Sequence, residues 1–353
     1  MSRFIPLAAL ALATAGLGLA GCSDNADQNG DTAAEEGETT LNVYSARKED
    51  LIAPLLDRFT EETGIEVKLL TAGAGTLLSR LESEGRNTPA DVLITVDAGN
   101  LQRAKESGVF QPIDSDTLRD NIPSNLRDVD DQWFGLSQRA RVIFTHKERV
   151  EDGEITSYAD LADPKFKGKV CIRSSDNVYN QSLVASLIAE HGEEWTEEWA
   201  EGLVDNLARK PQGGDRDQIS AVHAGECDIA VANTYYYGAM QNGSDSEREA
   251  ANAVRLVWPN QDERGAHVNV SGAGMVAASD KTEAVTELLE FLTTEESQEW
   301  YAQVNNEFPV RPGVPASETL EEWGDFKADD LNLSKLGELN PDAVRLMDRA
   351  GWQ

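Results

Sequence analysis

The sequence predicts an α/β protein with two lobes. Its 353 residues exceed the length at which a single hydrophobic core usually keeps growing. Strand-like and helix-like segments alternate along most of the chain, and one stretch breaks the alternation with two strand-like runs in succession. Alternating β and α segments predict parallel sheets covered by helices, and the break is where we expect the chain to cross between lobes.

The first series of elements begins with the strand-like "LNVYSA". The next segment, "EDLIAPLLDRFTEETG", places its apolar residues on one helical stripe and ends at Gly64, a typical helix stop. The strand "IEVKLLTA", a helix that includes Leu77 and Leu81, the buried strand "DVLITVD" and the helix "NLQRAKESGVF" complete the series.

The crossing is predicted at "WFGLSQRARVIFTHK", where no helix separates two strand-like runs. A second series follows with "GKVCIRSS", "NQSLVASLIAEHG", "DQISAVHAGE" and "CDIAVAN", and "VNVSGAGMVAA" is expected to return to the first lobe. The predicted N-terminal lobe therefore comprises 41–138 and 266–310, and the C-terminal lobe 139–265 and 311–353.

The N-terminus has the pattern of an exported lipoprotein. Arg3 precedes an apolar run that is too short to span a membrane, which predicts a signal peptide over 1–21. The closing "LAGC" resembles a bacterial lipobox, in which the cysteine, here Cys22, carries the lipid. The acidic stretch 22–40 has no apolar periodicity and is expected to be a solvated tether.

The chain is strongly acidic, with 63 Asp and Glu against 31 Lys and Arg and a net charge of −32. This excess makes nucleic acid an improbable partner. It also favours self-repulsion, which salt screens, so we interpret it as a halophilic acidic surface.

Three consecutive tyrosines, Tyr235, Tyr236 and Tyr237, follow the strand-like "CDIAVAN", and Tyr179 follows "GKVCIRSS" in the same way. If the two strands are parallel neighbours, these phenols meet at one sheet edge. A phenol has a pKa of about 10, so a cluster of phenolates requires a strongly charged, oxygen-preferring cation. The alternative is that the triplet is an aromatic strand end that only packs.

Longer blocks of the sequence resemble the periplasmic ferric-iron-binding proteins of ABC importers, especially the cyanobacterial iron-uptake lipoproteins. The resemblance extends from about Leu41 to Gln353. The blocks that carry it are "PADVLITVDAGNL", "WFGLSQRARVI", "LADPKFKGKVCIRSSDNVYNQSLVASLIAEHGEE", "ARKPQGGD", "ANTYYYG", "HVNVSGAG" and "FKADDLNLSKLGELNPDAVRLMDRAGW".

This resemblance implies a two-lobed periplasmic-binding-protein fold, also called a Venus flytrap, with strand crossovers between the lobes. It implies a monomeric, lipid-anchored periplasmic protein that holds Fe(III) in the interlobe cleft and delivers it to an inner-membrane ABC permease. By motif match, the metal ligands are Tyr179 in "NVYNQS" and Tyr235 and Tyr236 in "NTYY", whereas Tyr237 is expected to pack.

Relatives often supply a further ligand from "YSSRHY", where this chain reads "YSARKE" with Lys48 and Glu49 in the last two positions. The first lobe is therefore expected to contribute Glu49, an anion such as carbonate, or water. A basic shell near the cleft is expected to hold such an anion or to offset phenolate charge. Its predicted members are Arg47, Lys48, Arg139, Arg141 and Arg173.

Two cysteines, Cys171 and Cys227, belong to the two strands inferred to be neighbours. Export places them in an oxidising compartment, so they are expected either to form a disulfide or to be buried as small apolar residues.

Two other functions are open from the sequence. A solute-binding protein with a different cargo, such as Fe(II), a chelated metal or an organic cation, could use the tyrosines as an aromatic cage. An iron-dependent enzyme would usually require two histidines and a carboxylate. The four histidines are widely spaced and no G-x-S-x-G motif is present, so we expect no enzyme activity.

Overall fold

The computed structural model describes residues 39–353. The predicted signal peptide, Cys22 and nearly all of the acidic tether lie outside the described residues. Within 39–353 the strands are β1 (Thr40–Ser45), β2 (Glu66–Thr71), β3 (Val92–Val96), β4 (Phe110–Gln111), β5 (Phe134–His146), β6 (Val170–Cys171), β7 (Ile229–Asn233), β8 (Val254–Val257) and β9 (Val268–Val276).

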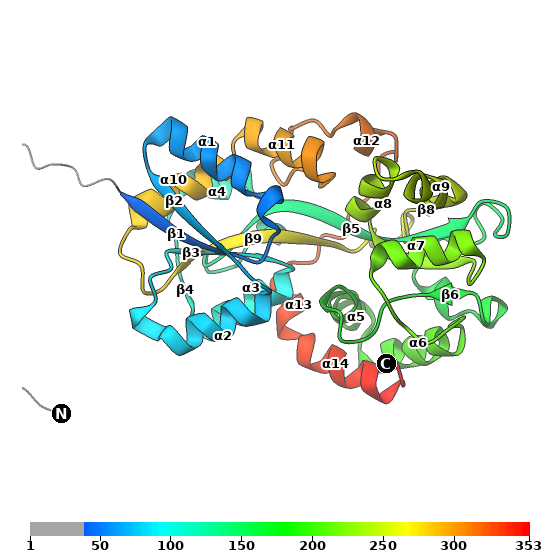
Figure 1. The fold of residues 1–353 in the computed structure, drawn as a ribbon. Helices are drawn as coiled ribbons and strands as arrows, with labels where there is room; N and C mark the ends of the chain where they lie inside the picture. Colours follow the sequence, from blue (N-terminus) through cyan, green and yellow to red (C-terminus); the bar gives the residue numbers. More distant parts are fainter. Residues whose placement is uncertain (1–38) are drawn as a thin grey trace, which may run out of the picture. The chain divides into compact units, whose positions relative to one another are not determined.

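The α-helices alternate with these strands, as the sequence predicts for an α/β protein (Figure 1). They are α1 (Ala53–Thr63), α2 (Ala74–Glu84), α3 (Ala98–Glu106), α4 (Asp116–Asn121), α5 (Val178–His191), α6 (Glu193–Asp205), α7 (Asp215–Ala224), α8 (Thr234–Gln241), α9 (Asp245–Ala253), α10 (Thr282–Leu292), α11 (Glu295–Asn305), α12 (Glu318–Glu321), α13 (Ser334–Glu338) and α14 (Asn340–Arg349).

The strands are hydrogen-bonded in the order β2-β1-β3-β9-β5-β7-β6, with β4 beside β9 and β8 beside β5. The pairs β1–β2, β1–β3 and β6–β7 are parallel, which follows from the helices that connect them. Helices α1 and α10 cover one face of the β1–β3 part of the sheet, and α2 and α3 cover the other (Figure 1).

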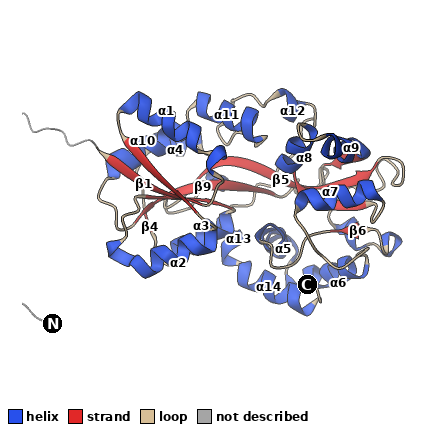
Figure 2. Ribbon diagram, viewed as in Figure 1, coloured by secondary structure: helices blue, strands red, loops and turns tan. Residues whose placement is uncertain are grey.

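The predicted crossing is a single long strand, β5, and not two separate runs. Its first half pairs antiparallel with β9, and its second half, from Arg141 onward, pairs with β7 and β8. The register with β9 is irregular between Gly135 and Ser137, near the start of the strand. Figure 2 shows β5 and β9 running together from one group of helices toward the other. The segment "VNVSGAGMVAA", expected to return to the first lobe, forms β9 and pairs antiparallel with β3 of the first series.

The C-terminal segment contacts elements from both series. Helix α13 packs on both α3 and α5, and α14 packs on α5 and α6. The Leu333 amide donates to the Asn125 carbonyl oxygen at 2.9 Å, whereas the Trp352 indole donates to the Arg173 carbonyl oxygen at 3.0 Å. The residue boundaries that the sequence suggests for the two lobes stay a prediction.

Cys171 of β6 and Cys227, which precedes β7, form a disulfide with their Cα atoms 6.0 Å apart. Both residues are buried in an apolar cluster with residues of α7, α8 and β7. The bond therefore joins the two parallel strands that lead into the tyrosine-bearing helices.

Candidate metal centre

The tyrosine triplet lies in the first turns of a helix and not at the end of a strand. Strand β7 ends at Asn233, which is the N-cap of α8, and the helix begins at Thr234. Successive residues of a helix are about 100° apart around its axis, so Tyr235 and Tyr236 can both face one space. Their ring centroids lie 4.2 Å apart. In a strand they would have pointed to opposite faces.

Tyr179 reaches the same place from α5. This helix begins at Val178 after the N-cap Asn177, and Tyr179 lies in its first turn. Strands β6 and β7 are parallel neighbours, with Cys171 opposite Ala230, so the helices that follow them start at the same sheet edge. The Tyr235 hydroxyl lies 3.2 Å from the Tyr179 hydroxyl. The three phenols predicted as ligands are therefore gathered, and each is partly exposed.

The third tyrosine of the triplet points away from this group. Tyr237 is 8% exposed, and its ring packs 5.0 Å from that of Phe144 and 5.8 Å from that of Trp323. These contacts belong to the apolar cluster around α7 and α8.

Two arginines lie against the ring of Tyr179. The guanidinium carbons of Arg139 and Arg173 are 5.5 Å and 5.6 Å from its centroid, within cation–π distance. Arg139 is 2% exposed, and neither of its terminal nitrogens has a hydrogen-bond partner among residues 39–353. Its one ion pair, with Asp97 Oδ2, is long at 3.7 Å. Arg139 therefore keeps most of its capacity to bind a negative group.

Asp215 is the carboxylate that connects Arg141 and Arg173 to the start of α8. It is the first residue of α7, is buried, and accepts hydrogen bonds from Arg141 Nη1 at 3.3 Å and Arg173 Nη1 at 3.4 Å. It also accepts from the backbone N–H of Asn233, the N-cap of α8, at 2.9 Å. The Arg141 guanidinium also donates to Asn180, next to Tyr179, at 2.6 Å.

Arg47 contributes a buried cation from the loop after β1. It pairs with Glu307 at 2.7 Å and donates to Ser137 Oγ at 3.2 Å. The neighbouring Lys48 and Glu49 are exposed at the start of a short 3₁₀ helix, and their side chains have no hydrogen bond or ion pair among the described residues. Thus the structure joins Arg47 to the buried polar network but not Lys48 or Glu49.

Tyr179 and Tyr235 are held in their neutral form. Burial raises the pKa of Tyr179, and the neighbouring phenol of Tyr236 raises it further. Burial likewise raises the pKa of Tyr235, followed by the effect of Tyr179 and Tyr236. In each case the Arg139 charge acts in the opposite direction. A cation that binds these oxygens must therefore displace protons.

A polar crevice too narrow for a water molecule lies beside Tyr179, toward β5 and β9. His267 lies in it, and burial together with Arg264, Arg141 and Arg139 lowers its pKa well below the ordinary value. The residues that line the crevice are Asp97, Arg139, Arg141, Tyr179, Asn233, His267 and Asn269. No group of three or more His, Cys, Asp and Glu residues suited to a metal occurs within 39–353. The candidate metal ligands of this region are the phenolic oxygens of Tyr179, Tyr235 and Tyr236.

Sequence reasoning missed Asp215 and Glu307 as partners of the arginines. Asp215 follows two glycines in "QGGD", a helix-start pattern that was available, but its partners are 74 and 42 residues away. Asp97 caps α3 by accepting from the Gly99 N–H. Its carboxylate also accepts from Ser182 Oγ at 2.6 Å, which sequence could not indicate.

Comparison with known proteins assigns the fold to a family. A model described as "bacterial extracellular solute-binding protein" matches residues 87–331. The chain belongs to this family of solute-binding proteins. No helix within 39–353 has both the length and the apolar character needed to cross a membrane.

Several members of the family are similar over nearly their whole length. "Iron uptake protein A1" of Synechocystis sp. is 47% identical over 337 residues, which cover 95% of this chain and 93% of the relative. A Trichodesmium structure (IdiA, FutA) in complex with iron and citrate ligands superposes with a TM-score of 0.87 at 48% identity, covering 89% of this chain and 100% of the other. Apo FutA2 from Synechocystis superposes with a TM-score of 0.85 at 45% identity, covering 90% and 100%.

These similarities confirm the two-lobed periplasmic-binding-protein fold class, since the solved relatives superpose over at least 89% of the chain. The family is one of solute-binding proteins and not of enzymes.

Proposed function

We propose that this protein captures Fe³⁺ between its two lobes and delivers it to an ABC importer. The observation that carries the proposal is the 3.2 Å distance between the hydroxyl oxygens of Tyr179 and Tyr235, with the Tyr236 ring tilted against that of Tyr235 at a centroid distance of 4.2 Å. Similar proteins with iron in their names, and one similar structure with iron bound, support the choice of cargo.

Three phenolates are the expected ligands, from Tyr179, Tyr235 and Tyr236. The total charge of three phenolates, about −3, balances that of a trivalent ion. Hard cations also prefer oxygen ligands. Without a metal, the raised pKa values of Tyr179 and Tyr235 keep these two phenols protonated at neutral pH. Binding then releases at least these two protons, so the apparent affinity for the metal should fall at least about a hundredfold for each pH unit of acidification.

The ring faces argue against an organic cation as cargo. Arg139 and Arg173 already lie over the Tyr179 ring. An organic cation placed on the Tyr179 ring would meet two guanidinium groups of like charge, whereas the phenolate oxygen of that ring would be stabilised by them.

The same arginines suit a small anion as an additional ligand of the metal. Arg139 is buried, and its two terminal nitrogens have no hydrogen-bond partner among residues 39–353, so bidentate binding of carbonate or a carboxylate would satisfy them. Glu49 of the first lobe is an alternative source of oxygen, since its exposed side chain has no partner among residues 39–353.

Delivery requires the lobes to open, and we propose β5 and β9 as the connection across which they move. The proposed lobes are 41–138 with 266–310, and 139–265 with 311–353. We further propose that the chain is a periplasmic lipoprotein attached through Cys22 and that its partner is an inner-membrane permease. Processing and lipidation can be tested by mass spectrometry of the protein from its native membrane fraction.

The test of the cargo is a titration of metal-free protein with ferric citrate. Coordinated phenolate should give a visible charge-transfer absorption, which should disappear in the Tyr235→Phe/Tyr236→Phe double variant. Tyr237→Phe is the matched control, since its ring packs in the apolar cluster, and it should keep the absorption. Protein that remains colourless and loses iron to citrate would contradict the proposal.

A further inference from the structure

The outer edge of β8 has no strand partner. Strand β8 pairs antiparallel with β5, in the register Thr145 opposite Arg255 and Ile143 opposite Val257. No other strand within 39–353 pairs with it. Strand edges of this kind can accept another extended chain through backbone hydrogen bonds.

The register shows which backbone groups are free. The Lys147 N–H donates to the Ala253 carbonyl oxygen at 3.0 Å, so Ala253, and by alternation Arg255 and Val257, turn their backbone groups toward β5. Leu256 then turns its N–H and C=O away from β5, and Trp258 continues the same edge. Neither of these two N–H groups donates a hydrogen bond within the described chain. They recur at the two-residue interval at which an added strand is bound.

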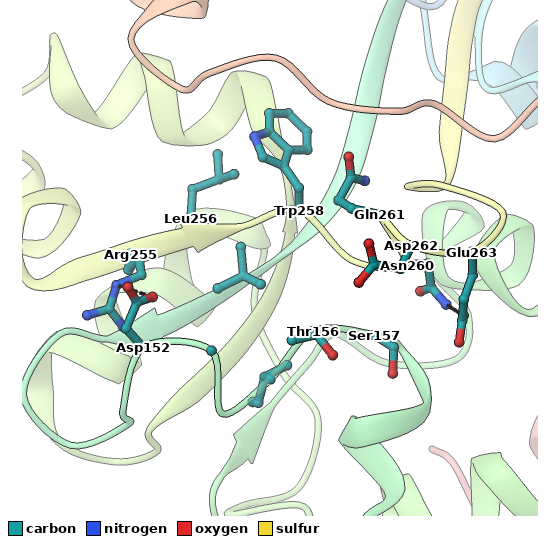
Figure 3. Close-up of a pocket in the computed structure, with 13 residues that line it drawn as sticks. Asp152, Thr156, Ser157, Arg255, Leu256, Trp258, Asn260, Gln261, Asp262 and Glu263 are labelled. Carbon is teal, nitrogen blue, oxygen red and sulfur yellow. Dashed lines mark hydrogen bonds and ion pairs between the residues drawn. The ribbon is translucent and has the colours of Figure 1, made fainter.

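The loop formed by residues 152–157 faces this edge across a hollow of about 360 Å³ (Figure 3). At one end the Asn260 N–H donates to the Thr156 carbonyl oxygen at 2.7 Å. Near the other end Arg255 Nε lies 3.3 Å from Asp152 Oδ1. Between these contacts no backbone hydrogen bond joins the loop to β8 within residues 39–353.

The hollow combines apolar walls with an acidic rim. Leu256, Val257 and Trp258 are each partly exposed along it. Asp262 and Glu263 are exposed on its rim (Figure 3). The Asp262 carboxylate has no hydrogen bond or ion pair in the part of the chain that is described. An occupant with both apolar and basic side chains would complement these surfaces.

We propose that the β8 edge is a docking site for an extended basic segment of a partner protein, which adds to the sheet as a strand beside Leu256 and Trp258. Apolar side chains of that segment would contact Trp258, and a Lys or Arg would pair with Asp262. A second copy of this chain does not fit, because two molecules of net charge −32 repel each other. The proposal does not depend on iron.

The test uses the ¹⁵N,²H-labelled chain and a synthetic nonapeptide of alternating Lys and Val, with a Glu/Val peptide of equal length as the charge control. Experiments at about 0.5 M salt reduce unspecific attraction to the acidic surface. The Lys/Val peptide should shift the amide signals of Leu256 and Trp258 and the Trp258 indole signal. The Glu/Val peptide should leave them unchanged.

Leu256→Pro removes the outward N–H without removing a β5–β8 hydrogen bond, and we expect it to weaken peptide binding about tenfold. Leu256→Ala is the matched control, since it keeps the N–H, and it should bind within about threefold of wild type. Asp262→Asn should weaken binding of the Lys/Val peptide and should have no effect with the Glu/Val peptide. If Leu256→Pro fails to fold, the wild-type amide shifts decide. Shifts scattered over the acidic surface, or equal binding by folded Leu256→Pro, would overturn the proposal.

Discussion

Asp215→Asn should lower the stability of the metal-free protein and yet let iron binding persist to lower pH. Asp215 is buried and accepts from Arg141, Arg173 and the Asn233 N–H. Removing one partner of a buried ion pair costs about 3–5 kcal/mol, because the other charge is left without compensation. Asparagine keeps one acceptor oxygen for Asn233, so we expect a loss near the lower end, about 3 kcal/mol, in urea unfolding.

The effect on iron has the opposite sign. The pKa values of Tyr179 and Tyr235 are raised mainly by burial and by neighbouring phenols, and the negative charge of Asp215 adds to the increase. Without that charge the phenols lose protons more readily, so the pH at which half of the bound iron is released should fall. The assay is the phenolate–iron absorption followed during acid titration.

Asp128→Asn provides the matched control. Asp128 is also a fully buried carboxylate in an ion pair, 2.7 Å from Lys105, but it has no contact with the tyrosines or with the arginines beside them. The Asp128→Asn variant should have a lower free energy of unfolding in urea, but it should release iron at the same pH as wild type. The prediction is refuted if the unfolding free energy of Asp215→Asn lies within 1 kcal/mol (about a factor of five in the equilibrium constant) of the wild-type value. It is also refuted if both variants change the pH of iron release equally.

Three further predictions concern stability. Gly238→Ala should cost about 1–3 kcal/mol in urea unfolding, because its Cβ would lie 2.8 Å from Asn306 Cγ. Replacing Cys171 and Cys227 by serine should cost about 4 kcal/mol, as expected for a disulfide with a sequence separation of 56 residues. His267→Gln should reduce the loss of unfolding free energy that acidification causes below pH 6.5. The pKa of His267 is lowered in the folded state, so the unfolded chain binds the proton first. Wild type should therefore lose up to about 1.4 kcal/mol per pH unit more than the variant.

Controls exist for each of these. Gly75→Ala, in α2 with no atom within 4 Å of the added Cβ, should stabilise by up to about 1 kcal/mol through helix propensity. The serine variant should match reduced wild-type protein, and a larger defect would point to lost packing. If the unfolding free energies of wild type and His267→Gln changed equally with pH between pH 5 and pH 6.5, the pKa of His267 would not be lowered in the folded state.

The sequence alone was sufficient for properties that depend on local pattern and composition. Alternating periodicities predicted the α/β class, and the lack of a helix between two strand-like runs in "WFGLSQRARVIFTHK" marked the crossing that became β5. Tyr179 and Tyr235 each follow a strand-like segment, and the parallel pairing considered for these two strands is confirmed by β6 and β7. Such features are encoded over a few residues, or by a repeat that can be read along the chain.

Tertiary structure decided what those residues face. The turn from strand to helix at Asn233, and not at a later residue, makes Tyr235 and Tyr236 converge and sends Tyr237 into the apolar cluster. Burial raises the phenol pKa values, and Asp215 collects donors from positions 18 to 74 residues away. Desolvation and long-range hydrogen bonds depend on which elements pack together, and no local pattern specifies that packing.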